Sequence, residues 1–124
     1  MHRRLRLVLL VSALTCAATA ATADDVGPLG SIARLEVSTT SADTYLQYHG
    51  RMFLKNEGGT VDEYRWGGVS CGTRVLTEGQ FAVLQAAQNN KKMLVEPLTQ
   101  DGQGLTKCLV GVRMVEKKNL KLFP

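Results

Sequence analysis

The chain has 124 residues, with 15 basic and 11 acidic side chains and a formal net charge of +4. This length is sufficient for one domain and too short for two domains of ordinary size. The near balance of charge excludes a protein that is basic over its whole surface, so nucleic acid is not an expected partner.

Residues 1–23 have the layout of a secretory signal peptide. A basic start precedes an apolar run over residues 5–14, and small residues with Ala-x-Ala endings follow. The run is shorter than the roughly 20 apolar residues that cross a bilayer, so no membrane span is predicted. We expect cleavage after Ala23, with Ala20 as the alternative, and export to the periplasm or the cell exterior. The net charge then falls to about +1, because three arginines leave with the signal.

A cysteine inside this signal raises the question of lipid modification. Cys16 follows Thr15, where lipoprotein signals usually carry Gly, Ala or Ser. We therefore expect Cys16 to be discarded with the signal rather than lipidated.

The first half of the remaining chain predicts three antiparallel strands. Residues 24–30 are a polar leader with Gly and Pro, expected to be flexible. Residues 31–39 alternate between two faces with a period of two, as a half-buried strand does. Residues 44–56 continue as a strand interrupted at Gly50, and the sequence EGGT predicts a turn before the strand at 61–71.

The pattern then changes to a helix followed by two strands. Thr77 and Gln80 have the spacing of a capping box, Leu76 and Phe81 that of a hydrophobic staple. Val83, Leu84 and Ala87 add an apolar side, and Asn89 and Asn90 are expected to end the helix in the left-handed conformation. A strand with Pro97 near its end, a turn at Asp101-Gly102 and a strand over residues 105–115 follow.

Three strands, a helix and two strands predict a mainly β fold, a small OB-fold-like five-stranded barrel. An open α+β antiparallel sheet with the helix on one face is the alternative. The single domain is expected over residues 31–117. Residues 118–124 form a C-terminal tail, and Lys117, Lys118 and Lys121 are interpreted as a solvated terminus.

Outside the signal peptide the chain has two cysteines, Cys71 and Cys108. In an exported protein a disulfide is the default fate of such a pair. Closing the intervening loop is worth about 3–4 kcal/mol in the chain-entropy model. A metal site would need further ligands, and this part of the chain has His49 as its one histidine, so neither a metal nor another cofactor is expected.

No arrangement of residues predicts catalysis. His49 has no neighbouring nucleophile motif, and there is no Gly-x-Ser-x-Gly sequence. Asp62 and Glu63 are adjacent, but neighbours on a strand point to opposite faces and are poorly placed to share a substrate. We therefore do not expect an enzyme.

Aromatic residues and arginines gather in the second and third predicted strands. The candidate binding residues are Tyr45, Tyr48, Arg51, Arg65 and Trp66. Aromatic and arginine side chains anchor interfaces, and aromatic rings also stack on sugars. Strand parity divides the set, because Tyr64 and Trp66 share one face while Arg65 takes the other.

The second half of the chain resembles a known family. Between Cys71 and Val112 the chain is similar to the B subunits of bacterial AB5 toxins of the subtilase-cytotoxin and typhoid-toxin kind. The similarity lies in a cysteine followed in turn by FAVLQAA, KKMLVEP and CLVGV. The resemblance implies an exported OB-fold, a pentameric ring and binding of sugars on host cells. The family's disulfide lies within its first half, and its serine-containing sugar-contacting stretch has no counterpart here, so no binding residue is carried over.

Two functions follow as hypotheses. The first is an exported non-catalytic binding module that takes a glycan, works as a homo-oligomer and resembles a toxin B subunit. The second is a periplasmic inhibitor of another protein, or a scaffold factor for envelope assembly, which binds a protein ligand and can work as a monomer.

Overall fold

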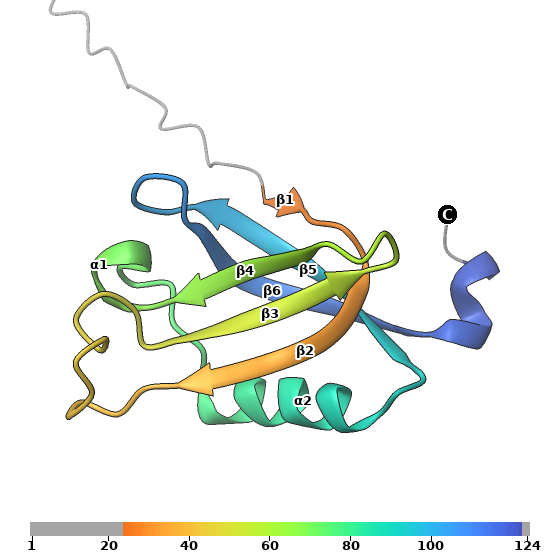
Figure 1. Cartoon of the computed structure of the whole chain (residues 1–124), viewed down its shortest axis with the longest axis horizontal. Coiled ribbons are helices and arrows are strands. Elements are labelled where there is room, and N and C mark those ends of the chain that lie inside the picture. Colours follow the sequence, from red (N-terminus) through yellow and green to blue (C-terminus); the bar gives the residue numbers. More distant parts are fainter. Residues whose placement is uncertain (1–23, 123–124) are drawn as a thin grey trace, which may run out of the picture.

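The computed structural model describes residues 24–122, so the predicted signal peptide and Cys16 lie outside the described residues. Figure 1 shows a barrel with one main helix. In chain order the elements are β1 (Asp25–Val26), β2 (Gly30–Val37), β3 (Gly50–Asn56), β4 (Val61–Trp66), α1 (Gly68–Cys71), α2 (Glu78–Asn89), β5 (Met93–Asp101), β6 (Lys107–Glu116) and the 3-10 helix η1 (Lys117–Leu122).

Strands β2 to β6 close into a five-stranded barrel. Around the barrel the order is β2, β3, β4, β6 and β5, and β5 returns to pair with β2 at Gly30 and Val95. All these pairs are antiparallel except β4 with β6, which meet in parallel at Arg65 and Cys108. The OB-fold-like prediction is confirmed, and closure excludes the open-sheet alternative.

The turn between β3 and β4 forms where EGGT predicts it. Gly59 has φ = 83°, a left-handed conformation that glycine adopts without a Cβ penalty. The hairpin directs Met52 and Leu54 of β3, and Tyr64 and Trp66 of β4, into the barrel core. The predicted division of β4, with its two aromatic rings on one face, is therefore confirmed.

Strands β2 and β6 each contain an irregularity in register, so neither alternates strictly, and β2 departs from the alternation predicted for residues 31–39. In β2 the register shifts between Ile32 and Arg34, so Ile32 and Leu35 both pack against the core although they are three residues apart. In β6 the shift lies opposite Leu98 and Thr99, and Leu109 and Val112 take the core positions. A bulge adds one residue to a strand and reverses the faces beyond it.

The segment before Gly50 is not the strand that the sequence predicted. Residues 39–48 form turns, in which the amides of Gln47 and Tyr48 both donate to the carbonyl of Thr44, at 3.0 and 3.1 Å. Residues 68–71, predicted to continue β4, form the short helix α1 instead. Gly67 and Gly68 cause this change, because both have positive φ and turn the chain out of the sheet.

Helix α2 begins with the predicted capping box. The Gln80 amide donates to the Thr77 hydroxyl at 3.2 Å, and the Thr77 amide donates to the Gln80 side-chain oxygen at 2.9 Å. The helix ends at Asn89 as predicted, but the cap Asn90 is extended rather than left-handed, and its amide donates to the Ala87 carbonyl at 3.2 Å. Leu84 and Ala87 are buried, whereas Val83, predicted on the apolar side, is exposed.

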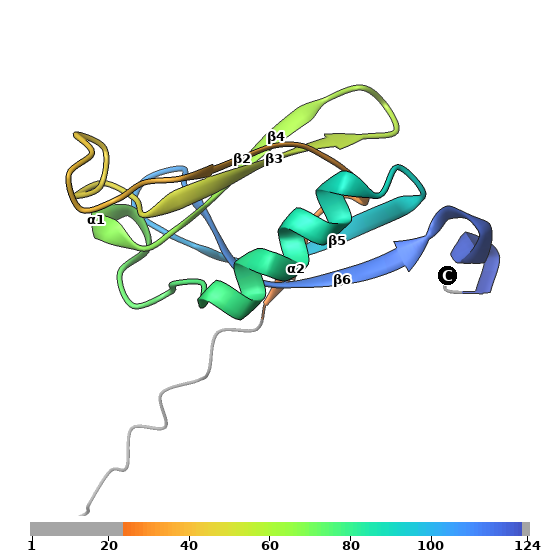
Figure 2. The same cartoon turned by 90° about the horizontal axis from the view of Figure 1, so that it is seen from below.

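Figure 2 shows α2 lying between the layer of β2, β3 and β4 and the hairpin of β5 and β6. This position lets the helix close one side of the core. Leu76 and Phe81, the predicted staple pair, are partly buried and pack against the core cluster. Neither α2 nor any other helix within residues 24–122 is long and apolar enough to span a membrane.

The predicted flexible leader contains strand β1, which pairs with β5 at Val26 and Leu98. Gly27 donates to the Pro97 carbonyl at 2.9 Å, and a Cβ at Gly27 would meet the Pro97 ring. Pro97 lies in the middle of β5 rather than near its end. A proline has no N–H to donate to a neighbouring strand. Pro97 is tolerated because it lies between the two contacts on one edge of β5, with β2 at Val95 and with β1 at Leu98.

The predicted disulfide between Cys71 and Cys108 is present, with the two Cα atoms 5.6 Å apart. It joins α1 to the start of β6, and both cysteines are buried. The turn of residues 102–106 packs on it: a Cβ at Gly102 would meet the Cys108 sulfur and the Ser70 carbonyl. The turn predicted at Asp101-Gly102 follows Asp101, the last residue of β5, and its residue with positive φ is Gly104, at 62°.

Candidate functional site

The five candidate binding residues lie in two different regions. Tyr45 belongs to the loop between β2 and β3, residues 38–49, and faces a groove beside α2. Trp66 lies beneath that groove with only 3% of its surface exposed. Arg51 and Arg65 lie on the outer face of β3 and β4, over the ring of Tyr48. Tyr48 belongs to the same loop as Tyr45 and is buried, with 6% of its surface exposed. The structure therefore divides the predicted set into a groove and a sheet face.

The loop of residues 38–49 is held by backbone hydrogen bonds at its base. Ser38 donates to the His49 carbonyl and His49 donates to the Trp66 carbonyl, both at 2.8 Å. Farther out, the α1 amides of Val69 and Ser70 donate to the carbonyls of Leu46 and Gln47, both at 2.9 Å. The loop that carries Tyr45 is thus anchored to the barrel and to α1 rather than extended into solvent.

Glycines make this close packing sterically feasible. A Cβ at Gly67 would overlap the His49 ring, and a Cβ at Gly68 would overlap the backbone of Gln47 and Tyr48. Both glycines also have positive φ. The two glycines directly after β4 therefore allow the loop to pack here, because no other residue type combines this backbone conformation with such a close approach.

The aromatic groove is the space between this loop and the first half of α2, with a volume of about 580 Å³. Aromatic and apolar surface is supplied by Tyr45, His49, Val75 and Phe81. Tyr45 and His49 stack, with ring centroids 4.2 Å apart and planes inclined by 12°. Rings presented side by side in this way offer a flat apolar surface next to polar groups.

Polar side chains border the same groove on both sides. Ser38 comes from the loop, Thr77 and Glu78 come from the start of α2, and Gln85 comes from its middle. Glu78 and Gln85 are exposed. A groove with apolar rings and a few hydroxyl, carboxylate and amide groups suits a ligand that combines apolar faces with hydroxyls.

Trp66 and Phe81 support the groove from below. Their ring centroids are 6.3 Å apart with the planes tilted by 52°, an arrangement usual for packed aromatic pairs. Gly50 lies directly against the Trp66 ring, so that a Cβ there would overlap it. Trp66 is therefore part of the core, and Tyr45 is the predicted residue that is accessible in this groove.

The outer face of β2, β3 and β4 carries a network of ion pairs. Arg51 contacts Glu36 and lies 3.6 Å from Glu63, and Arg65 also contacts Glu63. The two guanidinium groups lie over the ring of Tyr48, at 5.2 and 4.5 Å from its centroid. These arginines already have carboxylate and aromatic partners, so they stabilise the sheet and are less available for a ligand.

These contacts change the ionisation of two groups in the network. The hydrogen bond from Arg51, aided by its charge and that of Arg34, holds the pKa of Glu36 below its ordinary value in spite of partial desolvation. The same hydrogen bond raises the pKa of Arg51. Both groups are therefore held in their charged forms.

A second hollow lies at the edge of this face, between β4 and the turn of residues 102–106. It is lined by Glu63, Arg65 and Leu105, together with Thr106 and Lys107. Leu105 is fully exposed at the tip of the turn. Leu105 was not among the predicted binding residues, because a leucine within an apolar stretch indicates a strand rather than the tip of a loop.

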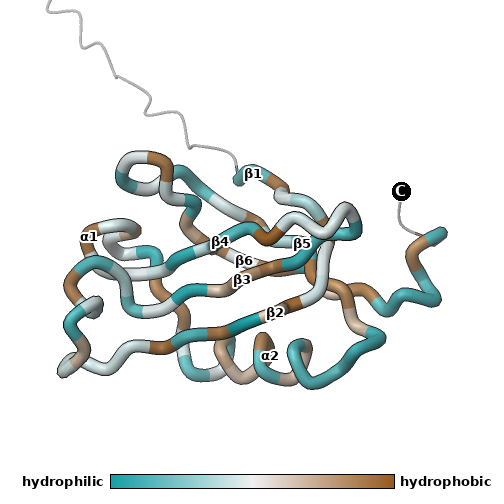
Figure 3. Tube along the Cα trace, in the orientation of Figure 1, coloured by the Kyte–Doolittle hydropathy of each residue, from teal (hydrophilic) through white to brown (hydrophobic). Residues whose placement is uncertain are grey.

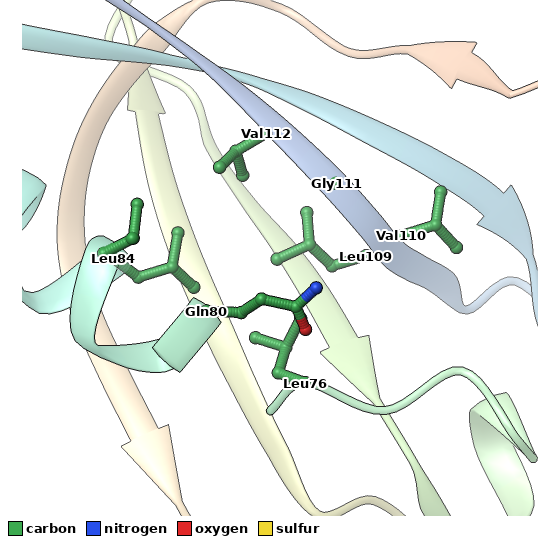
Figure 4. Close-up of a pocket in the computed structure, with 8 residues that line it drawn as sticks. Leu76, Gln80, Leu84, Leu109, Val110, Gly111 and Val112 are labelled. Carbon is green, nitrogen blue, oxygen red and sulfur yellow. The ribbon is translucent and has the colours of Figure 1, made fainter. Parts of the chain in front are cut away.

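The third hollow is an apolar pocket of about 240 Å³ between α2 and β6. Figure 4 shows Leu84 from α2 and Leu109 from β6 pointing toward each other across it, with Leu76 and Gln80 nearby. Leu84 and Leu109 are core residues, 2% and 1% exposed. Among the described residues that line this pocket Gln80 has the one polar side chain, and its oxygen already accepts from the Thr77 amide. The pocket is an extension of the core and offers little to a polar ligand.

The groups considered for catalysis are separated by the fold. His49 is stacked on Tyr45, and Glu63 faces the arginines on the outer sheet surface. Asp62 lies on the other side of β4, where its charge adds to burial in raising the pKa of Tyr64. Within residues 24–122 no three His, Cys, Asp or Glu side chains lie close enough together to hold a metal ion.

Residues from α2 complete the groove, and two of them, Glu78 and Gln85, were not among the predicted binding residues. Both are ordinary polar residues of an amphipathic helix, and helical periodicity does not reveal which loop packs beside the helix. Comparison of the chain with protein-family models, curated proteins and solved structures found no match.

Proposed function

We propose that this protein is an exported, non-catalytic binding module whose ligand site is the aromatic groove, and that the ligand is a glycan. The supporting observation is the stacked pair of Tyr45 and His49 beside the polar residues Glu78 and Gln85. Sugar rings have apolar faces that stack on aromatic rings and hydroxyls that bond to carboxylates and amides. The disulfide is consistent with export, because such bonds persist in oxidising compartments.

The first test is binding of residues 24–124 to a glycan array, followed by calorimetric titration with the best ligand. Tyr45→Ala is expected to weaken that ligand by about tenfold or more, because stacked aromatic anchors typically contribute above 1 kcal/mol. Gln85→Ala, on the opposite wall of the groove, is expected to weaken it as well. Both variants should keep the thermal midpoint of the parent protein within a few degrees.

The matched control is Leu46→Ala. Leu46 is next to Tyr45 in the same loop, is 78% exposed and does not line the groove. It should leave the affinity unchanged. Equal affinities for the parent, Tyr45→Ala and Gln85→Ala would show that the ligand binds elsewhere.

Assembly into a ring, which the resemblance to toxin B subunits implies, would strengthen such a module. Single sugar sites are weak, and linking several of them multiplies the overall affinity. The measurement is the mass of residues 24–124 by light scattering under oxidising conditions. A pentamer would support the ring, whereas a monomer would contradict it.

A protein inhibitor or envelope scaffold is the second candidate function, favoured by the hollow at the edge of the sheet face and by Leu105. A fully exposed leucine beside Arg65 and Glu63 has the apolar and charged character of a protein-docking surface. No binding on the glycan array, together with a one-to-one complex with an envelope protein that Tyr45→Ala leaves intact, would favour this second candidate.

A further inference from the structure

The end of the barrel opposite the loop of residues 38–49 carries a cluster of lysines drawn from three parts of the chain: the end of β3, the turn between α2 and β5, and η1. Figure 1 places the β3–β4 turn, the end of α2, the start of β5 and η1 at this end, away from α1 and the turn of residues 102–106. We call this cluster the lysine end. Its members, all exposed, are Lys55, Lys91, Lys92, Lys117, Lys118 and Lys121.

Backbone contacts hold these lysines together. The Lys117 amide donates to the Lys92 carbonyl at 2.9 Å, so the turn before β5 lies directly against the start of η1. Lys55 and Lys117 line one shallow hollow of about 390 Å³, together with Leu94 and Leu120. The tail that the sequence presents as three lysines is therefore one part of a larger basic surface.

Acidic neighbours neutralise only part of this charge. Glu116 forms an ion pair with Lys118 at 3.0 Å, and Glu57 lies in the hollow beside Lys55. Among residues 24–122, the other lysines of the cluster form no ion pair. Figure 3 shows hydrophilic colour over the end of α2, the turn into β5 and much of η1. The lysine end thus has an excess of about four positive charges.

Aliphatic side chains accompany the lysines. Leu120 is half-buried in the hollow, and Leu122 is 71% exposed at the end of η1. The described residues of the lysine end include neither aromatic side chains nor arginines, the groups on which nucleic-acid binders stack bases. Lysines with exposed leucines instead suit an anionic bilayer surface, where ammonium groups meet phosphates and an apolar side chain enters the interface.

We propose that the lysine end is a docking surface for a membrane containing anionic phospholipids. Docking in this orientation directs the loop of residues 38–49 and the aromatic groove away from the bilayer, where a ligand can reach them. The inference is independent of the identity of that ligand. It adds a second binding surface at the opposite end of the barrel.

The test is co-sedimentation of residues 24–124 with vesicles. This portion contains every described strand, α2 and the whole buried core, and it omits the apolar run of residues 5–14, which would enter vesicles by itself. The probes are vesicles of pure phosphatidylcholine and vesicles in which about one third is phosphatidylglycerol. Binding is expected to the second kind, to weaken with added salt, and to be absent from the first.

The variants Lys91→Gln and Lys121→Gln test whether separate elements form one surface. Each loss of a lysine is expected to weaken vesicle binding about fivefold, and the double variant about twenty-five-fold. Lys91 is informative because a purely C-terminal basic tail would not involve it. The matched control is Lys107→Gln with Arg113→Gln, which removes the same charge from residues outside the lysine end and should have little effect.

Three results would overturn the proposal. The first is equal loss in the control and in the lysine double variant, which would reveal a dependence on net charge alone. The second is an effect of Lys121→Gln without any effect of Lys91→Gln. The third is binding to duplex DNA at salt concentrations where the anionic vesicles are not bound.

Discussion

At the scale of single residues, the partners of a side chain decide its role more than its type does. Arginine is a residue type that often anchors interfaces. Arg51 and Arg65, however, already pair with Glu36 and Glu63 and lie over the Tyr48 ring. Tyr45, in contrast, stacks on a half-buried histidine at the edge of an open groove. Aromatic and arginine content pointed to this region of the chain, but only the contacts separate an available residue from an occupied one.

Glu36 provides a prediction at this scale. Its pKa lies below the ordinary value of 4.5, chiefly because Arg51 donates a hydrogen bond to it. A carboxyl whose pKa is lower in the folded chain adds stability above its unfolded pKa, and this is lost as the pH falls through the folded pKa. Glu36→Gln is therefore expected to lower the free energy of unfolding at pH 7, by an amount that shrinks below about pH 4.5.

The measurement is urea unfolding of the parent and the variant over a series of pH values. Glu57→Gln removes the same charge from the exposed turn between β3 and β4 and serves as the control. A constant difference between the parent and Glu36→Gln at every pH would contradict the assigned ion pair, because only an ionised Glu36 gains from Arg51.

At the scale of elements, local signals predicted the helix better than the strands. The capping box of Thr77 and Gln80 forms as expected because both partners lie within one turn of chain. Which strand residues face the core was harder to predict, because a single extra residue in β2 or β6 reverses the facing of every residue beyond it. Where an irregularity falls depends on the neighbouring strand, which the local pattern does not contain.

Gly79 provides a prediction for helix α2. It lies in the first turn, its φ is not positive, and an added Cβ would have only the Thr77 hydroxyl nearby, at 3.9 Å. Gly79→Ala is therefore expected to raise the free energy of unfolding by about 0.5–1 kcal/mol, since alanine loses less conformational entropy in a helix.

Thermal unfolding of this variant is best compared with that of Gly104→Ala. Gly104 also has open space around it, but its φ of 62° makes alanine strained. We expect the first substitution to stabilise and the second to destabilise. A decrease for Gly79→Ala would mean that the first turn of α2 is not helical in solution.

At the scale of the whole molecule, the disulfide links the two halves of the barrel. It connects α1, which holds the loop of residues 38–49, to the start of β6 beside the turn of residues 102–106. A domain of this size buries a modest core, and a cross-link between residues far apart in sequence restricts its unfolded chain strongly.

Replacing both Cys71 and Cys108 with alanine is expected to lower the free energy of unfolding by about 3–4 kcal/mol. The measurement is urea unfolding under oxidising conditions. In a reducing buffer the parent protein should unfold at the same urea concentration as the variant, which controls for the loss of the buried sulfur atoms. Equal midpoints for the parent and the variant under oxidising conditions would contradict the stabilising role of the bond.

Local patterns in the chain were enough to predict the class of fold, the position of α2, the cysteine pair and the division of β4 into two faces. These features depend on local chemistry or on elimination: caps and turns act within a few residues, and only two cysteines lie beyond residue 23. The closure of the barrel, the path of residues 39–48, the aromatic groove and the lysine end became visible in the folded molecule. Each of these brings together side chains from distant segments, and their packing distances are set by the whole barrel rather than by any stretch of its sequence.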